Sequence, residues 1–281
     1  MSKVPVGLSI AGVELVLAGD RALRAEIEAS SWSGFVCDPA RPFLLVEVKT
    51  RKSACWPHDV EPKAALLAPG RLRVSHPGFV LDWSLVDGRA VISYAPARRL
   101  AAQLVPVALH SALRCLCATA AAARGGLLLH ASAVAVRRRG ALFVGASDAG
   151  KSTAAAQFAP RAVLNDELIG VSFAGPRAWL HATPFSGTLN APRRRRRVVL
   201  AHGFGLRKAR AFGLAPMSAA ETMRLLLRCT AMPAGESELE RWALAAAARL
   251  AASAPWAQLS FAKSAPDTAK CIAAVIGGGK T

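Results

Sequence analysis

The first third of the chain alternates short apolar runs with turn residues. Phe79–Val86 and Ala90–Tyr94 flank the dipeptide Asp87-Gly88, and an Asp-Gly pair between apolar runs is a strong signal for a β-hairpin. Val13–Leu17 and Phe43–Val48 are earlier runs of the same kind. Residues 1–97 are therefore expected to form a small, mostly β module. No motif in it indicates a role.

From Arg98 to Ala123 the apolar residues recur with helical spacing, and Arg124-Gly125-Gly126 then ends the pattern. The next two apolar runs, residues 127–136 and 141–144, predict strand, turn and strand. Further helices are expected at 219–229 and 238–252. Residues 98–281 are thus predicted to be a second domain of the α/β class, a mixed sheet with helices.

A glycine-rich segment directly follows the strand at 141–144. It fits the pattern G-x-x-x-x-G-K-[ST] at every fixed position, an apolar strand precedes it, and the helix-forming residues 154–158 follow it. In such a loop, backbone N–H groups and the following helix N-terminus point at phosphates, Lys151 contacts the β and γ phosphates, and the Ser152 hydroxyl binds Mg²⁺. The expected nucleotide-binding residues are Gly145, Ala146, Ser147, Asp148, Ala149, Gly150, Lys151, Ser152 and Thr153.

Two adjacent acids, Asp166 and Glu167, end a short apolar strand that begins soon after the loop's helix. If the pair lies beside the loop, one carboxylate can hold Mg²⁺ directly or through water, and the other can accept a proton from an attacking hydroxyl. A solvated acidic turn is the alternative. The sequence does not assign the two roles; it favours Asp166 as base or shared metal contact and Glu167 as the supporting acid, with Ser152 as the third metal ligand.

Four blocks in this order resemble the HPr kinase/phosphorylase-related serine kinases, whose core is also similar to ATP-dependent phosphoenolpyruvate carboxykinase. The blocks are residues 127–134, the loop, Asn165-Asp166-Glu167 and Thr183–Thr188. The resemblance implies a P-loop kinase domain that uses ATP and Mg²⁺ to phosphorylate a hydroxyl. It places His130 near the reacting phosphate, beside Lys151, Asp166 and Glu167 as catalytic residues, and lets Thr183–Thr188 line the pocket.

Two positions depart from the family pattern. HPr kinases carry two aspartates where this chain has Asp166-Glu167, and a glycine after the histidine where it has Ala131. The expected acceptor is therefore a serine of another peptide or protein, or a small-molecule alcohol. Two alternatives stay open: a non-catalytic ATP-binding sensor or scaffold, and carboxykinase-like chemistry, for which the extra metal and oxyacid ligands are not found in the sequence.

The 281 residues carry a formal charge of +18, which raises the question of a polyanionic partner. Residues 125–281 account for +13 of it, including the runs Arg137–Arg139 and Arg193–Arg197. No stacking pattern or nucleic-acid motif accompanies the charge, and 27 Arg against 9 Lys suggest the codon bias of a GC-rich genome. In the fold that the resemblance implies, Arg193–Arg197 would lie near the mouth of the site and could meet an acidic acceptor.

The remaining features predict a cytoplasmic protein that can form homo-oligomers. The six cysteines have no metal-ligand spacing and are expected to be ordinary buried or free thiols. The N-terminus makes a poor secretory signal, and Pro106 and Arg114 interrupt the most apolar stretch, Leu100–Ala123, so no membrane span is expected. The tail Gly277–Thr281 is expected to fray.

Overall fold

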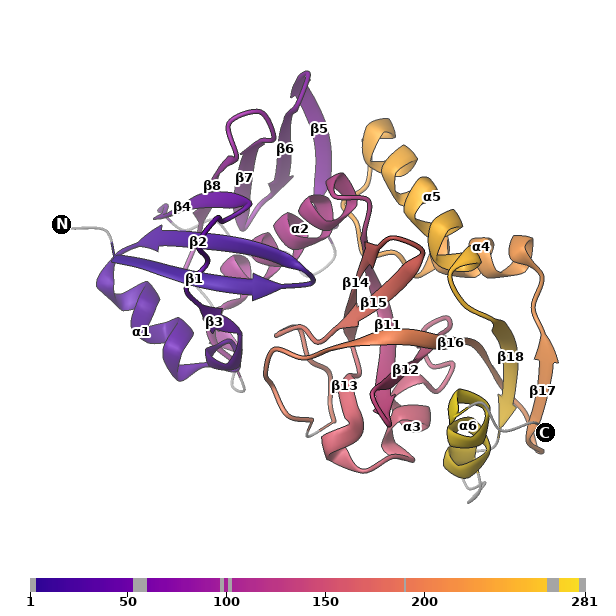
Figure 1. Ribbon diagram of the computed structural model, residues 1–281. Helices are drawn as coiled ribbons and strands as arrows, with labels where there is room; N and C mark the ends of the chain where they lie inside the picture. The colour runs from indigo at the N-terminus through magenta and orange to yellow at the C-terminus, as the bar shows by residue number, and fades with distance from the viewer. Residues whose placement is uncertain are drawn as a thin grey trace. The chain divides into compact units, whose positions relative to one another are not determined.

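The computed structural model describes residues 4–52, 60–96, 99–100, 103–189, 191–261 and 268–277. The chain divides into two compact units (Figure 1). Unit 1 comprises Met1–Ala120 and Met232–Glu240, and unit 2 comprises Ala121–Ala231 and Arg241–Thr281. Each contains one large mixed β-sheet, so the fold is of the mixed α/β type. The boundary expected between residues 97 and 98 stays a prediction.

Unit 1 is built on an eight-stranded sheet with the order β3-β1-β2-β4-β8-β7-β6-β5. The expected hairpin at Asp87-Gly88 is confirmed: β7 and β8 pair antiparallel, and Gly88 adopts a φ of 60° in the turn. Helix α1 (Arg21–Ala29) was not predicted, because only Leu23 and Ile27 on it are buried. The strands are β1 (Val4–Ile10), β2 (Val13–Gly19), β3 (Val36–Cys37), β4 (Leu44–Thr50), β5 (Lys63–Ala68), β6 (Arg71–His76), β7 (Phe79–Ser84) and β8 (Arg89–Tyr94).

The long helix predicted from Arg98 begins later than expected. Helix α2 runs over Val107–Ala123, and the short strands β9 (Arg99–Leu100) and β10 (Gln103–Pro106) precede it. Pro106 explains the difference, because proline cannot donate a backbone hydrogen bond inside a helix and disfavours helical geometry in the residue before it. The C-terminal end is as predicted, with Gly125 at a φ of 71° and its N–H bonded to the Ala122 carbonyl.

The sheet of unit 2 has the order β12-β11-β14-β15-β16-β18-β17, and β13 pairs with β11 at the side. An additional parallel pairing of β12 with β16 closes five of these strands into a circuit. The strand-turn-strand prediction before the glycine-rich segment is confirmed by β11 and β12. The strands are β11 (Leu127–Val136), β12 (Arg139–Val144), β13 (Val163–Asn165), β14 (Leu168–Ala174), β15 (Arg177–His181), β16 (Arg197–Lys208), β17 (Gly213–Pro216) and β18 (Trp256–Phe261).

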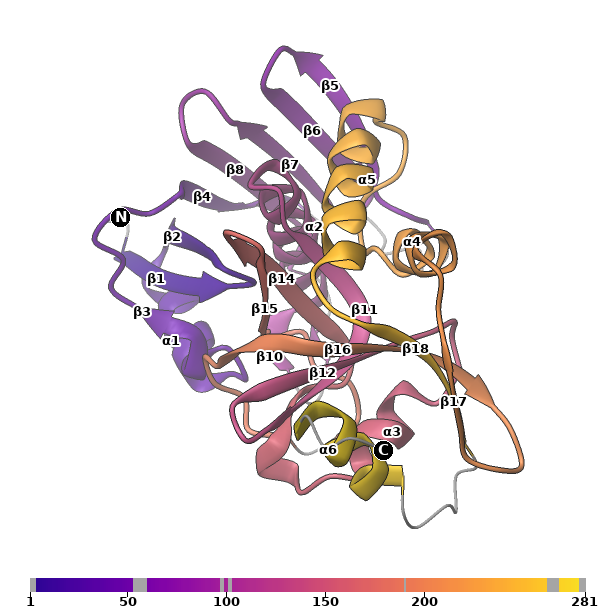
Figure 2. The same cartoon turned by 45° about the vertical axis from the view of Figure 1, so that its right-hand side comes forward.

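Two helices of unit 2, α3 (Lys151–Ala156) and α6 (Thr268–Gly277), lie side by side against the sheet (Figures 1 and 2). Phe143, Phe204 and Leu259 of β12, β16 and β18 belong to the buried cluster that they cover. This packing fixes the loop between β12 and α3. The predicted helices at 219–229 and 238–252 are confirmed as α4 (Ala219–Arg228) and α5 (Ser237–Ala252). Residues 278–281 of the expected frayed tail lie outside the described residues.

The net charge is divided very unevenly between the units. Unit 1 contains 14 Lys and Arg against 13 Asp and Glu, a net charge of +1, whereas unit 2 contains 22 against 5, a net charge of +17. The excess therefore belongs almost wholly to the unit that carries the glycine-rich segment. In the described ranges, no helix is both long and apolar enough to cross a bilayer.

Candidate functional site

The segment Gly145–Gly150, here called the glycine loop, connects β12 to α3. Asp148 and Gly150 both have positive φ angles, 61° and 99°, and the Ala149 N–H donates to the Ala146 carbonyl at 3.2 Å. Left-handed residues in such a turn bring successive N–H groups to one concave side, which suits an anion. A Cβ at Gly145 would lie 2.7 Å from the Ala149 Cβ, so glycine is required there.

Lys151 follows the loop directly and is 7% exposed. Its Nζ donates to the carbonyls of Gly145 and Ala146 at 3.1 and 2.9 Å. An ammonium has three donors, so one is left for a ligand in the loop's concavity. The Ser132 hydroxyl of β11 donates to the Lys151 carbonyl at 2.7 Å and ties the start of α3 to the sheet.

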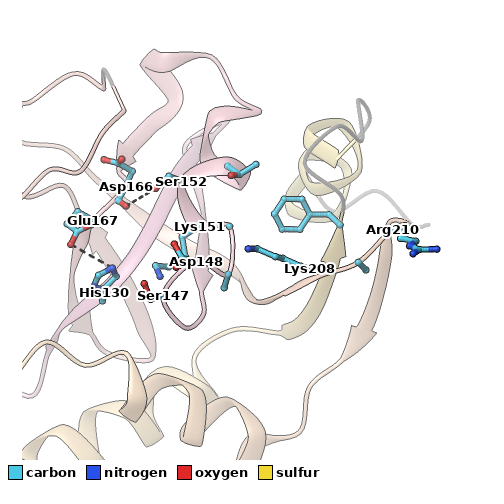
Figure 3. Close-up of a pocket in the computed structure, with 14 residues that line it drawn as sticks. His130, Ser147, Asp148, Lys151, Ser152, Asp166, Glu167, Lys208 and Arg210 are labelled. Atoms are coloured by element: carbon cyan, nitrogen blue, oxygen red, sulfur yellow. Dashed lines mark hydrogen bonds and ion pairs between the residues drawn. The ribbon is translucent and has the colours of Figure 1, made fainter.

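The two acids predicted beside the loop are there, but their side chains have different surroundings. Asp166 is 2% exposed. Its Oδ1 accepts the Gly187 N–H at 3.0 Å, and its Oδ2 accepts the N–H groups of Thr188 and Leu189 at 2.8 and 2.9 Å. Three backbone donors thus occupy this carboxylate, and in Figure 3 it points away from Lys151 and Ser152.

Glu167 faces the other way, toward His130 on β11. Its Oε1 lies 3.7 Å from the His130 Nε2, and the two side chains are 40% and 47% exposed (Figure 3). Both acids lie in the bend between β13 and β14, where the chain changes direction, so that one acid is buried and the other reaches the cavity. The Glu167 N–H donates to the Asn165 Oδ1 at 2.8 Å and fixes this geometry.

Ser152 joins the loop to the acidic pair. Its hydroxyl lies 3.5 Å from the main-chain oxygen of Asp166. Asn165 holds the next segment in place, because its Nδ2 donates to the Thr183 carbonyl at 2.8 Å and the Thr183 hydroxyl donates to the Leu168 carbonyl at 2.6 Å.

A single cavity of about 870 Å³ collects most of the predicted residues. Gly145 and Ala146 do not line the cavity, but their carbonyls accept hydrogen bonds from Lys151, which does. One wall was not foreseen: the end of β16 and the end of β18 contribute two cations and an aromatic ring. The lining residues are His130, Ser147, Asp148, Ala149, Gly150, Lys151, Ser152, Thr153, Asp166, Glu167, Lys208, Ala209, Arg210 and Phe261.

Two expectations about the cavity need correction. Thr183–Thr188 does not line it; Thr183 is buried, and the end of the segment binds Asp166 from behind. The described arginines of Arg193–Arg197 do not line it either. Strands β12 and β16 run parallel, and the glycine loop follows Val144, which pairs with Gly205 near the C-terminal end of β16. Arg197 lies at the other end of β16, next to Val199, which pairs with Arg139. It is therefore remote from the glycine loop.

Comparisons with known proteins give little more. No protein-family model matches the sequence, and no curated protein matches it. Among solved structures, the chain is similar to the Hpr(Ser) kinase/phosphatase from Coxiella burnetii, with 9% sequence identity and a TM-score of 0.30, over 54% of this chain and 94% of that chain. A likeness of this strength assigns neither fold nor function.

Proposed function

We propose that the protein is an ATP- and Mg²⁺-dependent phosphotransferase that moves the γ-phosphoryl group to a hydroxyl of a peptide, a protein or a small molecule. One observation carries the proposal: the glycine loop, Lys151 and Ser152 open into the same cavity as the pair His130 and Glu167. A phosphate-binding loop and a proton acceptor in one cavity of about 870 Å³ are what phosphoryl transfer requires.

The phosphates are held by the loop. The backbone N–H groups of the loop, in which Asp148 and Gly150 have positive φ angles, and the remaining donor of Lys151 supply the contacts. Helix α3 has only six residues, so the backbone groups of the loop and the lysine matter more than any helix dipole. They lie at fixed positions before the nucleotide arrives, which lowers the cost of ordering the site.

The donors around Ser152 fit Mg²⁺, which prefers oxygen ligands and keeps several waters. The Ser152 hydroxyl and the Glu167 carboxylate reach the same cavity, and the main-chain oxygen of Asp166 lies 3.5 Å from that hydroxyl. Ser152 would hold the ion directly and one Glu167 oxygen would hold it through a water, which leaves the other Glu167 oxygen to accept a proton. The described residues hold no group of three His, Cys, Asp or Glu side chains suited to a metal, and a nucleotide-bound Mg²⁺ needs only one or two carboxylates. When bound, the ion neutralises charge on the phosphates.

Glu167 rather than Asp166 takes the proton in this proposal. The acceptor oxygen bonds to the γ-phosphorus, the bond from that phosphorus to the β,γ-bridging oxygen breaks, and ADP leaves with the electron pair. The hydroxyl proton passes to the Glu167 carboxylate, which His130 faces. Asp166 is less suited to this task because three backbone N–H groups already occupy its oxygens.

The test measures binding and transfer separately. Binding of Mg-ATP is followed by calorimetry, and transfer from γ-labelled ATP is followed to a serine-containing peptide library, to simple alcohols and to water. Lys151→Ala should weaken ATP binding by about tenfold or more, since it removes a charge-assisted contact of at least about 1.4 kcal/mol. Binding without transfer to any hydroxyl would favour a sensor or scaffold, and no ATP binding at all would refute the proposal.

A further inference from the structure

The unforeseen wall of the cavity is cationic. Lys208 ends β16, Arg210 follows two residues later, and both line the cavity opposite the acidic pair. Backbone pairing holds this wall in place. Lys208 pairs with Phe261 in the β16–β18 ladder, and the Ala209 N–H donates to the Phe261 carbonyl at 3.1 Å.

Within the described part of the chain, neither Lys208 nor Arg210 forms an ion pair or a side-chain hydrogen bond, whereas several cations of unit 1 are neutralised by carboxylates, such as Arg73 by Asp82 at 2.6 Å. Two of the three acids that line the cavity are engaged elsewhere, since Asp166 binds backbone N–H groups and Glu167 faces His130. The third, Asp148, lies exposed on the glycine loop, and its single carboxylate does not balance the three cations Lys151, Lys208 and Arg210. A second cation beside a lysine repels it unless an anion lies between them. The cations Lys151 and Lys208 in one cavity therefore favour the binding of an anionic ligand.

We infer that Lys208 is a second phosphate-binding cation, which contacts the polyphosphate of the nucleotide from the side opposite Lys151. This inference rests on the proposed function and adds a binding residue to it. In Figure 3 the Lys208 ammonium is directed toward the glycine loop, while the Arg210 guanidinium points away from it. Lys208 is thus the contact residue, and Arg210 contributes to the field at the cavity mouth.

The chain offers a matched control on the same strand. Arg207 precedes Lys208 and carries the same charge, but it does not line the cavity, and its Nε lies 3.3 Å from the Ser260 hydroxyl. Both side chains are exposed, so neither substitution should disturb the fold. Lys208→Ala and Arg207→Ala lower the net charge equally, and any difference between them reports a local contact.

The experiment measures the Kd of inorganic tripolyphosphate and of Mg-ATP by calorimetry at 0.15 M salt, where the Debye length is about 8 Å. Lys208→Ala should raise both Kd values by about tenfold or more, because a hydrogen bond to a charged group contributes about 1.5–3 kcal/mol. Arg207→Ala should change them less than about threefold, and Lys208→Arg should recover part of the affinity. Melting curves verify that each variant is folded.

The outcomes separate this inference from the proposed function. If the wild type binds both ligands and the two alanine variants behave alike, Lys208 is no phosphate contact, but the proposed function stands. If Lys208→Ala weakens ATP binding and leaves tripolyphosphate binding unchanged, Lys208 contacts the nucleoside, and the inference is equally wrong. If the wild type binds neither ligand, the proposed function fails and this inference fails with it.

Discussion

The hydrogen bonds of Asp166 give a quantitative prediction about the stability of unit 2. In the wild type, the Gly187 N–H donates to Oδ1 of Asp166 at 3.0 Å, and the N–H groups of Thr188 and Leu189 donate to Oδ2. In Asp166→Asn, the amide oxygen can take the place of Oδ2 and keep the last two bonds. The amide NH₂ group then takes the place of Oδ1 and faces the Gly187 N–H, donor against donor. The variant loses one bond, leaves a donor without an acceptor, and turns two charge-assisted bonds into neutral ones. At about 1.5–3 kcal/mol for a bond to a charged group, the loss should be about 3 kcal/mol.

A loss of this size is easily measured. For a unit of this length, 1 kcal/mol corresponds to about 2–4 °C in Tm, so Asp166→Asn should lower the melting temperature by about 6–12 °C. Hydrogen exchange should show faster exchange of the amides of Gly187, Thr188 and Leu189. Glu167→Gln is the control; its exposed contact with His130 at 3.7 Å contributes less than about 1 kcal/mol. Equal melting temperatures for the two variants, with residues 187–189 still protected, would show that Asp166 does not hold this segment.

Two further predictions concern the loop and the sheet. Gly150→Ala places a Cβ on a residue with a φ of 99°, 3.1 Å from the Phe261 ring, so it should weaken ATP binding at least tenfold in calorimetry. Gly175→Ala is the control, because Gly175 has a φ of 57° and nothing lies within 4 Å of its added Cβ. It should lower the free energy of unfolding by about 1 kcal/mol and leave ATP binding unchanged. Burial, and then Arg197, lower the pKa of His181 to about 4, so His181 stays neutral in the folded protein while the unfolded chain is protonated below about pH 6.5. The contribution of neutral His181 to the free energy of unfolding is therefore complete above about pH 6.5 and is lost as the pH falls toward 4, with a loss of about 2 kcal/mol at pH 5. Urea unfolding at pH 7 and pH 5 should show a smaller difference in the free energy of unfolding for His181→Gln than for the wild type. An equal difference in the two proteins would show that His181 is not the group responsible.

Local patterns predicted the parts of the site that are close in sequence. The strand before the glycine loop, the turn at Gly125 and the acidic pair after a short strand follow from spacing and residue type, whereas His130 was indicated only by the resemblance to the HPr kinases. The different environments of Asp166 and Glu167 could not be predicted, because the donors to Asp166 come from residues 187–189, more than twenty positions later. Lys208 and Phe261 meet only through the pairing of β16 with β18, and a single lysine at a strand end gives no signal of that.

The charge distribution bears on what the cavity binds. Codon bias acts along the whole chain, so it accounts for the excess of arginine over lysine, but not for a net charge of +1 on unit 1 and +17 on unit 2. The difference arises equally from the acids, 13 in unit 1 and 5 in unit 2, and from the cations, 14 in unit 1 and 22 in unit 2. A unit that repels itself this strongly loses stability, and a polyanionic ligand relieves that repulsion. Tripolyphosphate should therefore raise the melting temperature of unit 2 more at 0.05 M than at 0.5 M salt, because salt screens the exposed cations. A stabilisation independent of salt would mean that the charge of unit 2 plays no part in binding the ligand.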